Sequence, residues 1–107
     1  MLRRIVIHAE FQSFIKAADS CRVPHFFVPV LPEDEGIFAY GVTITGKLGN
    51  AVKRNLLKRR IKAWFYTNRD LLPEGIKINL IARSGACELA WPDVSLELSQ
   101  LVTLLSQ

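Results

Sequence analysis

The order of structural elements is clearest in residues 37–66, which read IFAYGVTITGKLGNAVKRNLLKRRIKAWFY. The first part, Ile37–Thr45, is dense in β-branched and aromatic residues and predicts a strand. The glycines of the following segment, 46–49, permit a tight turn into a helix that runs from Asn50 to about Tyr66. Asn50 is a suitable N-cap for this helix. A strand, a glycine-rich loop and a helix therefore form the centre of the expected fold.

The helix that begins at Asn50 has two faces of different chemistry. Apolar residues recur at helical spacing on one face, at Leu57, Ile61, Trp64 and Phe65. The other face carries Asn55, Lys58, Arg59 and Lys62. We expect the apolar face to pack on a sheet and the cationic face to remain accessible.

Weaker patterns on both sides of this stretch complete the architecture. Before it, the sequence is compatible with an edge strand at Arg3–Ile7, a helix from His8 to about Ala18 and a strand at His25–Leu31. Pro29 lacks a backbone donor and points to an edge position or a bulge. After it, the patterns predict a strand at Ile76–Ala82 and a helix from about Pro92 to Leu105. This order predicts an α/β two-layer sandwich with a mixed sheet, in a single domain over residues 1–107.

Positive charge is concentrated in the middle of the chain. The 14 Lys and Arg residues exceed the 10 Asp and Glu residues by only 4. However, Ile37–Arg69 contains no acidic residue, whereas acids gather at 33–35 and toward the C-terminal end. One surface should therefore be positive, and a polyanion would be drawn to it.

The sequence contains no arrangement of residues that would make the chain an enzyme by itself. It has no clustered carboxylates for metal ions, no histidine pair and none of the common nucleotide-loop, metalloprotease or nucleophile-elbow motifs. Cys21 and Cys87 lack the spacing of a zinc site and are interpreted as free thiols of a reducing compartment. Without a secretory signal or an apolar span, we expect a cytoplasmic protein with no membrane contact.

The cationic face has two interpretations. A solvated helix surface is the usual one, but such a surface normally interleaves acids, and this helix has none. Asn55 adds a donor and an acceptor, and the glycine-rich loop adds backbone donors for phosphate, so RNA is favoured. The alternatives are an RNA-binding module without a processing role, like a ribosomal protein, and a protein-interaction domain that uses Trp64 and Trp91.

The segment Lys47–Arg59, KLGNAVKRNLLKR, closely resembles the signature of the bacterial ribonuclease P protein, K-x-G-x-A-V-x-R-N-R-x-K-R. Leu56 stands where the signature has its second arginine. The resemblance extends over nearly the whole chain, through Glu10-Phe11-Gln12, Tyr40–Thr45 and Ile81-Ala82-Arg83.

The resemblance implies a sandwich with a left-handed βαβ crossover and a protein subunit without catalytic residues. The partners would be ribonuclease P RNA, which would perform Mg²⁺-dependent cleavage, and precursor tRNA, whose 5′ leader would be removed. No obligate protein partner is expected. The expected RNA-binding residues are Lys47, Asn50, Lys53, Arg54, Asn55, Lys58, Arg59, Arg60 and Lys62. The single-stranded leader would lie in a cleft lined by Phe11, Ile15 and Phe27.

Overall fold

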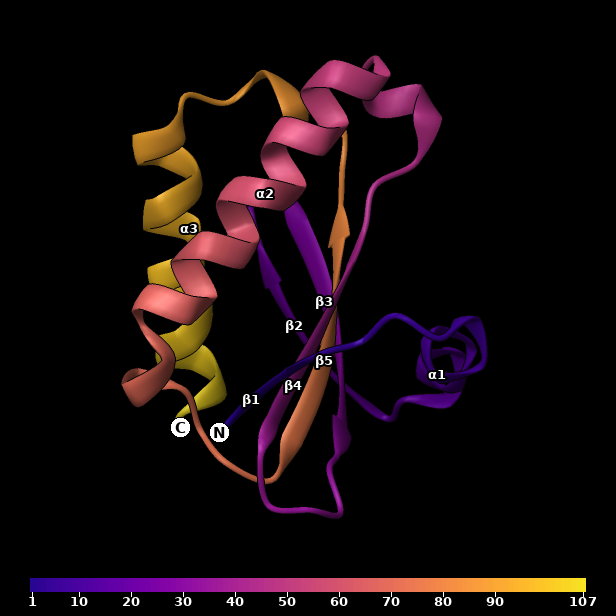
Figure 1. Cartoon of the computed structure of the whole chain (residues 1–107), viewed down its shortest axis with the longest axis vertical. Helices are drawn as coiled ribbons and strands as arrows, with labels where there is room; N and C mark the ends of the chain where they lie inside the picture. The colour runs from indigo at the N-terminus through magenta and orange to yellow at the C-terminus, as the bar shows by residue number, and fades with distance from the viewer.

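The structure, a computed structural model, describes residues 1–107 and contains a mixed sheet of five strands in the order β1-β4-β5-β3-β2 (Figure 1). The strands are β1 Leu2–Arg4, β2 Asp19–Val23, β3 Phe26–Pro32, β4 Phe38–Thr43 and β5 Ile76–Ala82. The helices are α1 His8–Gln12, α2 Ala51–Thr67 and α3 Trp91–Leu105, and a short 3-10 helix, Ser13–Lys16, continues α1. Strands β1, β4 and β5 are parallel, and β3 and β2 continue the sheet in antiparallel pairing.

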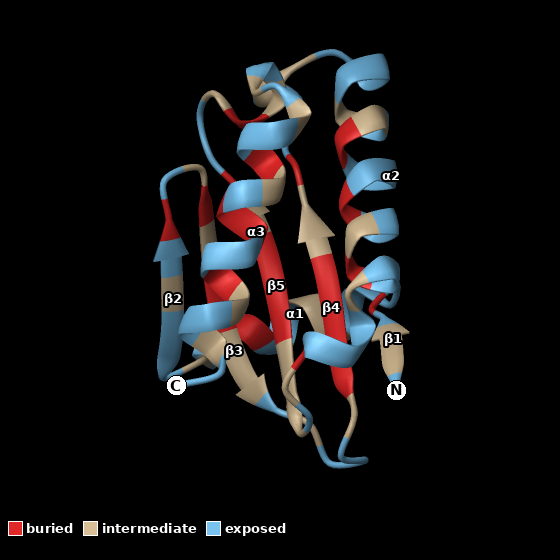
Figure 2. Ribbon diagram, turned by 90° about the vertical axis from the view of Figure 1, so that its left-hand side faces the viewer, coloured by how far each residue is buried: buried red, intermediate tan, exposed pale blue.

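The main core lies between the sheet and the layer formed by α2 and α3, while α1 lies against the opposite face (Figure 1). Buried residues form continuous runs in β4 and β5, the central strands of the sheet, and line the inner sides of both long helices (Figure 2). The ring of Phe65 on α2 stacks on that of Tyr40 at 4.5 Å and lies 5.8 Å from that of Phe38. The two-layer α/β prediction is therefore correct, with a short helix added on the second face.

Helix α2 connects the adjacent parallel strands β4 and β5 in the left-handed sense. In Figure 2, α2 lies on the viewer's side of the sheet, β4 runs upward and β5 lies to the left of β4. Nearly all such connections in proteins are right-handed. The crossover implied by the resemblance is thus present, and its consequence is that α2 lies toward the β1 edge of the sheet.

The start and the apolar face of α2 follow the sequence prediction. The Asn50 side chain caps the helix, because its Oδ1 accepts a hydrogen bond from the Lys53 backbone N–H at 2.9 Å. Leu57, Ile61 and Phe65 are buried against the sheet. Trp64, the fourth residue of this face, is half-buried, and its Nε1 donates to the Ser95 hydroxyl of α3.

Two predictions on the N-terminal half are wrong. Strand β3 lies inside the sheet, between β5 and β2, although Pro29 suggested an edge strand or a bulge. The pairing of β3 with β5 is interrupted at 28–29 and resumes in the same register, so no residue is inserted. The actual edge strand, Asp19–Val23, was not predicted because most of its residues are polar and exposed. The second wrong prediction concerns the helix that was expected to reach Ala18. Its regular α-helical part ends at Gln12.

A group of ionic side chains fixes α1 against the sheet. Arg3 on β1 donates to both carboxylate oxygens of Glu10, at 2.8 and 2.7 Å, and to Glu33 at 3.2 Å. Lys77 of β5 lies 3.4 Å from the same Glu10 carboxylate. The hydrogen bonds from Arg3 hold the pKa of Glu10 below its usual value. This group therefore positions the helix that carries Phe11.

Replacement of Glu10 by glutamine should make the stability of the fold less dependent on pH in the acidic range. A carboxyl whose pKa is lowered by folding stabilises the folded state above its unfolded pKa, about 4.3 for Glu. This contribution is lost as the pH falls through the folded pKa. Melting temperatures between pH 7 and pH 3 should therefore fall less steeply for Glu10→Gln than for the wild type. Glu74→Gln, at an exposed site without an ion pair, is the control and should leave the profile unchanged.

Candidate nucleic-acid interface

The predicted RNA-binding residues lie on the outer surface of α2 and on the loop before it. Eight of the nine are exposed: Lys47, Asn50, Lys53, Asn55, Lys58, Arg59, Arg60 and Lys62. Arg54 is half-buried, and its Nε donates to the Gly49 carbonyl at 3.0 Å. Arg54 therefore stabilises the glycine-rich loop through this hydrogen bond and also adds positive charge to the surface.

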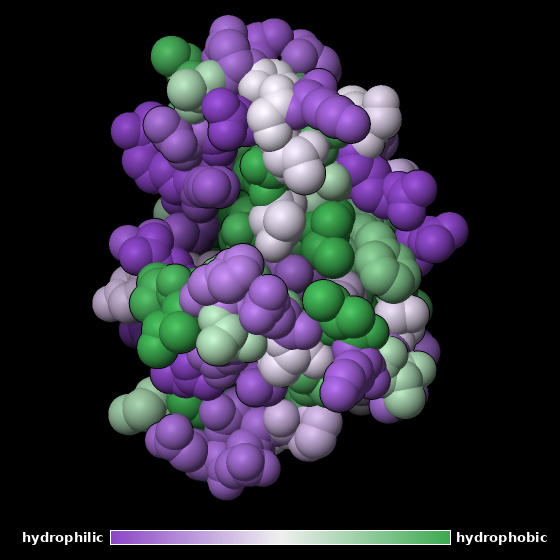
Figure 3. All heavy atoms as spheres, turned by 90° about the vertical axis from the view of Figure 1, so that its right-hand side faces the viewer, coloured by the Kyte–Doolittle hydropathy of each residue, from purple (hydrophilic) through white to green (hydrophobic).

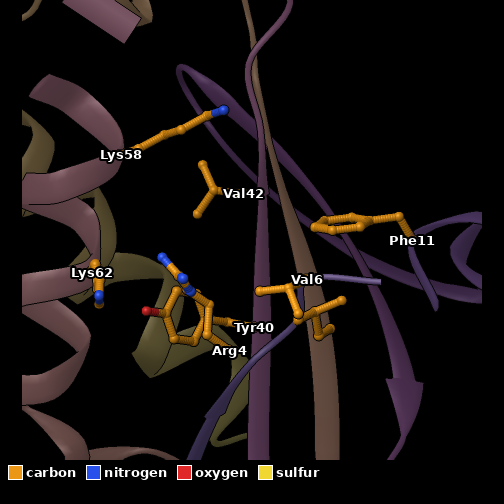
Figure 4. A pocket seen from close by; sticks show the side chains of 8 residues that line it. Arg4, Val6, Phe11, Tyr40, Val42, Lys58 and Lys62 are labelled. Atoms are coloured by element: carbon orange, nitrogen blue, oxygen red, sulfur yellow. The ribbon is translucent and has the colours of Figure 1, made fainter. Parts of the chain in front are cut away.

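One flank of α2 borders a hollow of about 320 Å³ that we call the cationic hollow (Figure 4). Lys58 and Lys62 enter it from α2, Arg4 from β1 and Phe11 from α1. Its apolar lining comes from Ile5, Val6, Tyr40 and Val42. Three cations around an open hollow favour binding of a phosphate group.

Tyr40 adds a hydroxyl group to this hollow. Its side chain is almost completely buried, and this burial raises the pKa of its phenol above the usual value. The phenol is therefore protonated at neutral pH and can donate to an anion. Sequence reasoning predicted Lys58 and Lys62 but missed Arg4, because β1 and α2 come together only in the folded chain.

The other flank of α2 has a different character. Lys53, Leu56 and Arg60 border a small hollow together with Trp91, and the Arg60 guanidinium lies 6.0 Å from the Trp91 ring centroid. Leu56, which replaces an arginine of the signature, is half-buried on this flank. The substitution therefore lies beside the apolar contacts of α2 with α3, away from the cationic hollow.

Lys53 has an acidic partner that the sequence pattern did not reveal. The Glu88 carboxylate, in the short 3-10 helix Ala86–Glu88, lies 2.9 Å from the Lys53 Nζ. Both side chains are exposed, at 46% and 60%. An exposed ion pair of this kind contributes little to stability, so a phosphate can replace the carboxylate at low cost.

Glu88→Gln should strengthen RNA binding. The change frees Lys53, and an exposed pair of this type is worth about 0.2–1 kcal/mol, which corresponds to at most about a fivefold lower Kd. The gain should shrink as salt increases. Filter binding to an RNA ligand at several salt concentrations measures it. In the Lys53→Ala background Glu88→Gln should have a smaller effect, and equal effects in both backgrounds would show that the ion pair is irrelevant.

The face of the sheet next to α1 carries a second hollow, of about 280 Å³, which we call the aromatic cleft. It is lined by Phe11, Phe14, Ile15, Ala17, Ser20, Phe27, Pro29, Asn79 and Ile81. Apolar residues gather in the middle of this face, with hydrophilic residues around them (Figure 3). All three predicted cleft residues, Phe11, Ile15 and Phe27, are therefore brought together.

The aromatic residues divide between the core and the cleft. Phe26 is buried in the core, and Phe14 is buried but also lines the aromatic cleft. Phe11 and Phe27 are half-buried and line the same cleft. Arg22 of β2 lies with its guanidinium 5.5 Å from the Phe27 ring centroid and adds a cation to this side. Since Phe11 lines both hollows, the cationic hollow and the aromatic cleft are neighbours.

The structure contains no group of three or more His, Cys, Asp or Glu side chains that could hold a metal ion. Cys21 and Cys87 are free, and burial raises the pKa of both thiols. None of the helices is long and apolar enough to cross a bilayer. The arrangement offers cations, hydrogen-bond donors and aromatic surfaces, which are the groups that bind a polynucleotide.

Comparison with known proteins gives consistent matches over nearly the whole chain. The family described as Ribonuclease P matches residues 2–106. The ribonuclease P protein component of Enterococcus faecalis is 32% identical over 102 residues, which cover 94% of this chain and 86% of that protein. The same component of Mesoplasma florum is 35% identical, with coverage of 87% and 86%.

Solved structures agree with these matches. The RNase P protein of Staphylococcus aureus has a TM-score of 0.85 and 29% identity, and the match covers 94% of this chain and 93% of that chain. The RNase P protein of Thermotoga maritima has a TM-score of 0.83 and 25% identity, with coverage of 92% and 94%.

Proposed function

Because the chain belongs to the bacterial ribonuclease P protein component family and is the protein subunit of that ribonucleoprotein endonuclease, we propose how its surface is used. In this proposal α2 and the loop before it bind ribonuclease P RNA, and the aromatic cleft holds the single-stranded 5′ leader of precursor tRNA. The observation that carries the proposal is the position of Phe11, which lines both the cationic hollow and the aromatic cleft. A single strand can therefore pass from phosphate-binding cations to a stacking surface.

The proposal gives the two surfaces different tasks. Lys58, Lys62 and Arg4 bind backbone phosphates where the leader meets the catalytic RNA. Phe11, Ile15 and Phe27 contact the bases of the leader, because an aromatic or flat apolar surface stacks with any base. The remaining members of the proposed RNA-binding set are Lys47, Asn50, Lys53, Arg54, Asn55, Arg59 and Arg60.

The chemistry of cleavage is assigned to the RNA subunit, and no residue of this chain is proposed to be catalytic. Mg²⁺ is proposed to be bound mainly by phosphates of the RNA subunit and of the substrate, since it binds oxygen ligands such as these. The cations of α2 would lower the repulsion between phosphates brought together at the junction. Cleavage would then need a lower concentration of Mg²⁺ in solution. Residues 1–107 are proposed to act as one domain in this assembly, in agreement with the family match to 2–106.

A leader-length series tests the proposal. Precursor tRNAs with leaders from zero to about ten nucleotides are bound to ribonuclease P RNA alone and to RNA assembled with this protein. We expect the protein to increase affinity more for substrates with a leader than for leaderless tRNA. Equal gains at every leader length would mean that the cleft does not bind the leader.

A further inference from the structure

Trp91 provides a half-buried aromatic surface on the flank of α2 that faces α3. It is the first residue of α3 and lines the small hollow that Lys53, Leu56 and Arg60 border from α2. The volume of this hollow, about 50 Å³, is too small to enclose a ligand. A flat ligand would therefore lie over the Trp91 ring, in contact with the apolar side chains around it.

The position of Arg60 leaves the Trp91 ring accessible to such a ligand. The Arg60 guanidinium lies over the ring at 6.0 Å from its centroid, so the two groups are not stacked in direct contact. A base held between two groups needs them apart by about twice the base-stacking distance of about 3.4 Å. Arg60 is exposed, and its long side chain can move outward by the small difference. Unpaired RNA bases stack on aromatic rings and on arginine guanidinium groups alike, so Trp91 and Arg60 together suit one base.

The surroundings of Leu56 favour RNA as the ligand. Lys53 and Arg60 lie on the same flank as Leu56, about one helical turn before it and one turn after it. Of the acids nearby, Glu88 is paired with Lys53, and Asp93 lies in the first turn of α3, where the helix dipole favours a negative charge. An apolar surface between two cations can bind a base together with its flanking phosphates. Leucine in place of the arginine of the signature thus adds apolar surface where a base would lie.

The position of this flank separates it from the leader. No residue of the hollow at Trp91 lines the cationic hollow or the aromatic cleft. In Figure 1, α3 lies to the left of α2, whereas α1, which contributes Phe11 to the aromatic cleft, lies to the right. A ligand on Trp91 is therefore on the other side of α2 from a leader in the cleft. The flank continues the α2 surface that is proposed to bind the RNA subunit.

We propose that one unpaired base of ribonuclease P RNA stacks between Trp91 and Arg60, while Lys53 binds a neighbouring phosphate. The contact tolerates any base, because every base has a π-face. It is independent of the leader and holds the protein on the RNA subunit. This assignment rests on the proposed function, in which α2 binds ribonuclease P RNA.

The affinity of three variants for bacterial ribonuclease P RNA, without substrate, tests the stacking contact. Trp91→Leu keeps an apolar side chain but has no ring, and its Kd should rise by about 5- to 150-fold, as expected for the loss of one stacked base. Trp91→Phe still offers a ring and should lose much less. Leu96→Ala removes an exposed apolar residue of α3 that does not line this hollow and should leave the Kd unchanged. Melting temperatures show whether each variant keeps the fold.

The fluorescence of Trp91 itself gives a measurement that does not depend on the stability of Trp91→Leu. The chain has two tryptophans, so Trp64→Phe leaves Trp91 as the only one. Its emission should be strongly quenched when ribonuclease P RNA is added to saturation, because a stacked base lies against the indole. The matched control is Trp91→Phe, in which Trp64 is the only tryptophan. Trp64 lines a different hollow, with Asn68 and Leu71, and its emission should change little.

The outcomes separate this inference from the proposed function. If the wild type does not bind ribonuclease P RNA, the proposed function fails, and the role of Trp91 fails with it. If the wild type binds but the emission of Trp91 in Trp64→Phe is unchanged at saturation, only the role of Trp91 is overturned. Equal losses of affinity in Trp91→Leu and Trp91→Phe would overturn it too, because a ring at this position would then make no difference.

Discussion

Replacement of Lys58 and Lys62 together by alanine should weaken binding to ribonuclease P RNA and its substrate, and should make this binding less sensitive to salt. Each cation that neutralises a phosphate contributes about one to the slope of log K against log salt concentration. Because both side chains line the cationic hollow, we expect the magnitude of the slope to fall by about 2. Affinity measurements between low and moderate salt provide the slope.

Two observations make this test specific. The side chains of Lys58 and Lys62 are exposed on α2, so their removal should leave the melting temperature nearly unchanged. Arg69→Ala is the matched control, since Arg69 lies beyond the C-terminal end of α2 and its guanidinium packs 4.3 Å from the Tyr66 ring centroid. A slope that is the same in the double variant and in Arg69→Ala would contradict phosphate binding in the cationic hollow.

Phe11→Ala should weaken binding of precursor tRNA with a leader by about 5- to 150-fold, because stacking of one base on an aromatic ring is worth about 1–3 kcal/mol. The loss should disappear for leaderless tRNA, since Phe11 lines the cleft proposed for the leader. Kd values of the reconstituted enzyme for the two substrates measure both effects. An equal loss for both substrates would assign Phe11 to another contact.

A variant that keeps the phenylalanine gives an independent test. Gly41→Ala places a methyl group where the Phe11 ring now lies, so the ring must move away from the sheet. The same leader-specific loss is expected, in a smaller amount. Leu71→Ala, at an exposed apolar residue after α2 that lines neither hollow, should change neither substrate.

The elements with long regular patterns were predictable from the sequence. The predictions of helix α2, of its cap at Asn50 and of strand β5 at Ile76–Ala82 are correct. Apolar residues recur in α2 at helical spacing over several turns and alternate with polar residues along part of β5. Strand β2 was missed because Asp19–Val23 is an exposed edge strand without apolar alternation. Pro29 misled the prediction, since an internal strand can tolerate it where the ladder to one neighbour is interrupted.

The candidate site was predictable only where its residues are close in sequence. The cations of α2 could be identified from one acid-free segment, and Phe11, Ile15 and Phe27 from the resemblance. Arg4 and Glu88 come to this surface from other elements, so only tertiary structure places them there. Local spacing contains no information on such contacts.

We propose that the basic helix and the aromatic cleft help a catalytic RNA to process precursor tRNA. The most direct measurement is the rate of leader removal at low Mg²⁺ by bacterial ribonuclease P RNA, with and without this protein. At low Mg²⁺, cleavage should be rapid only when the protein is present, and the difference should become small at high Mg²⁺. Cleavage at low Mg²⁺ that is no faster with the protein than with the RNA alone would contradict this proposal.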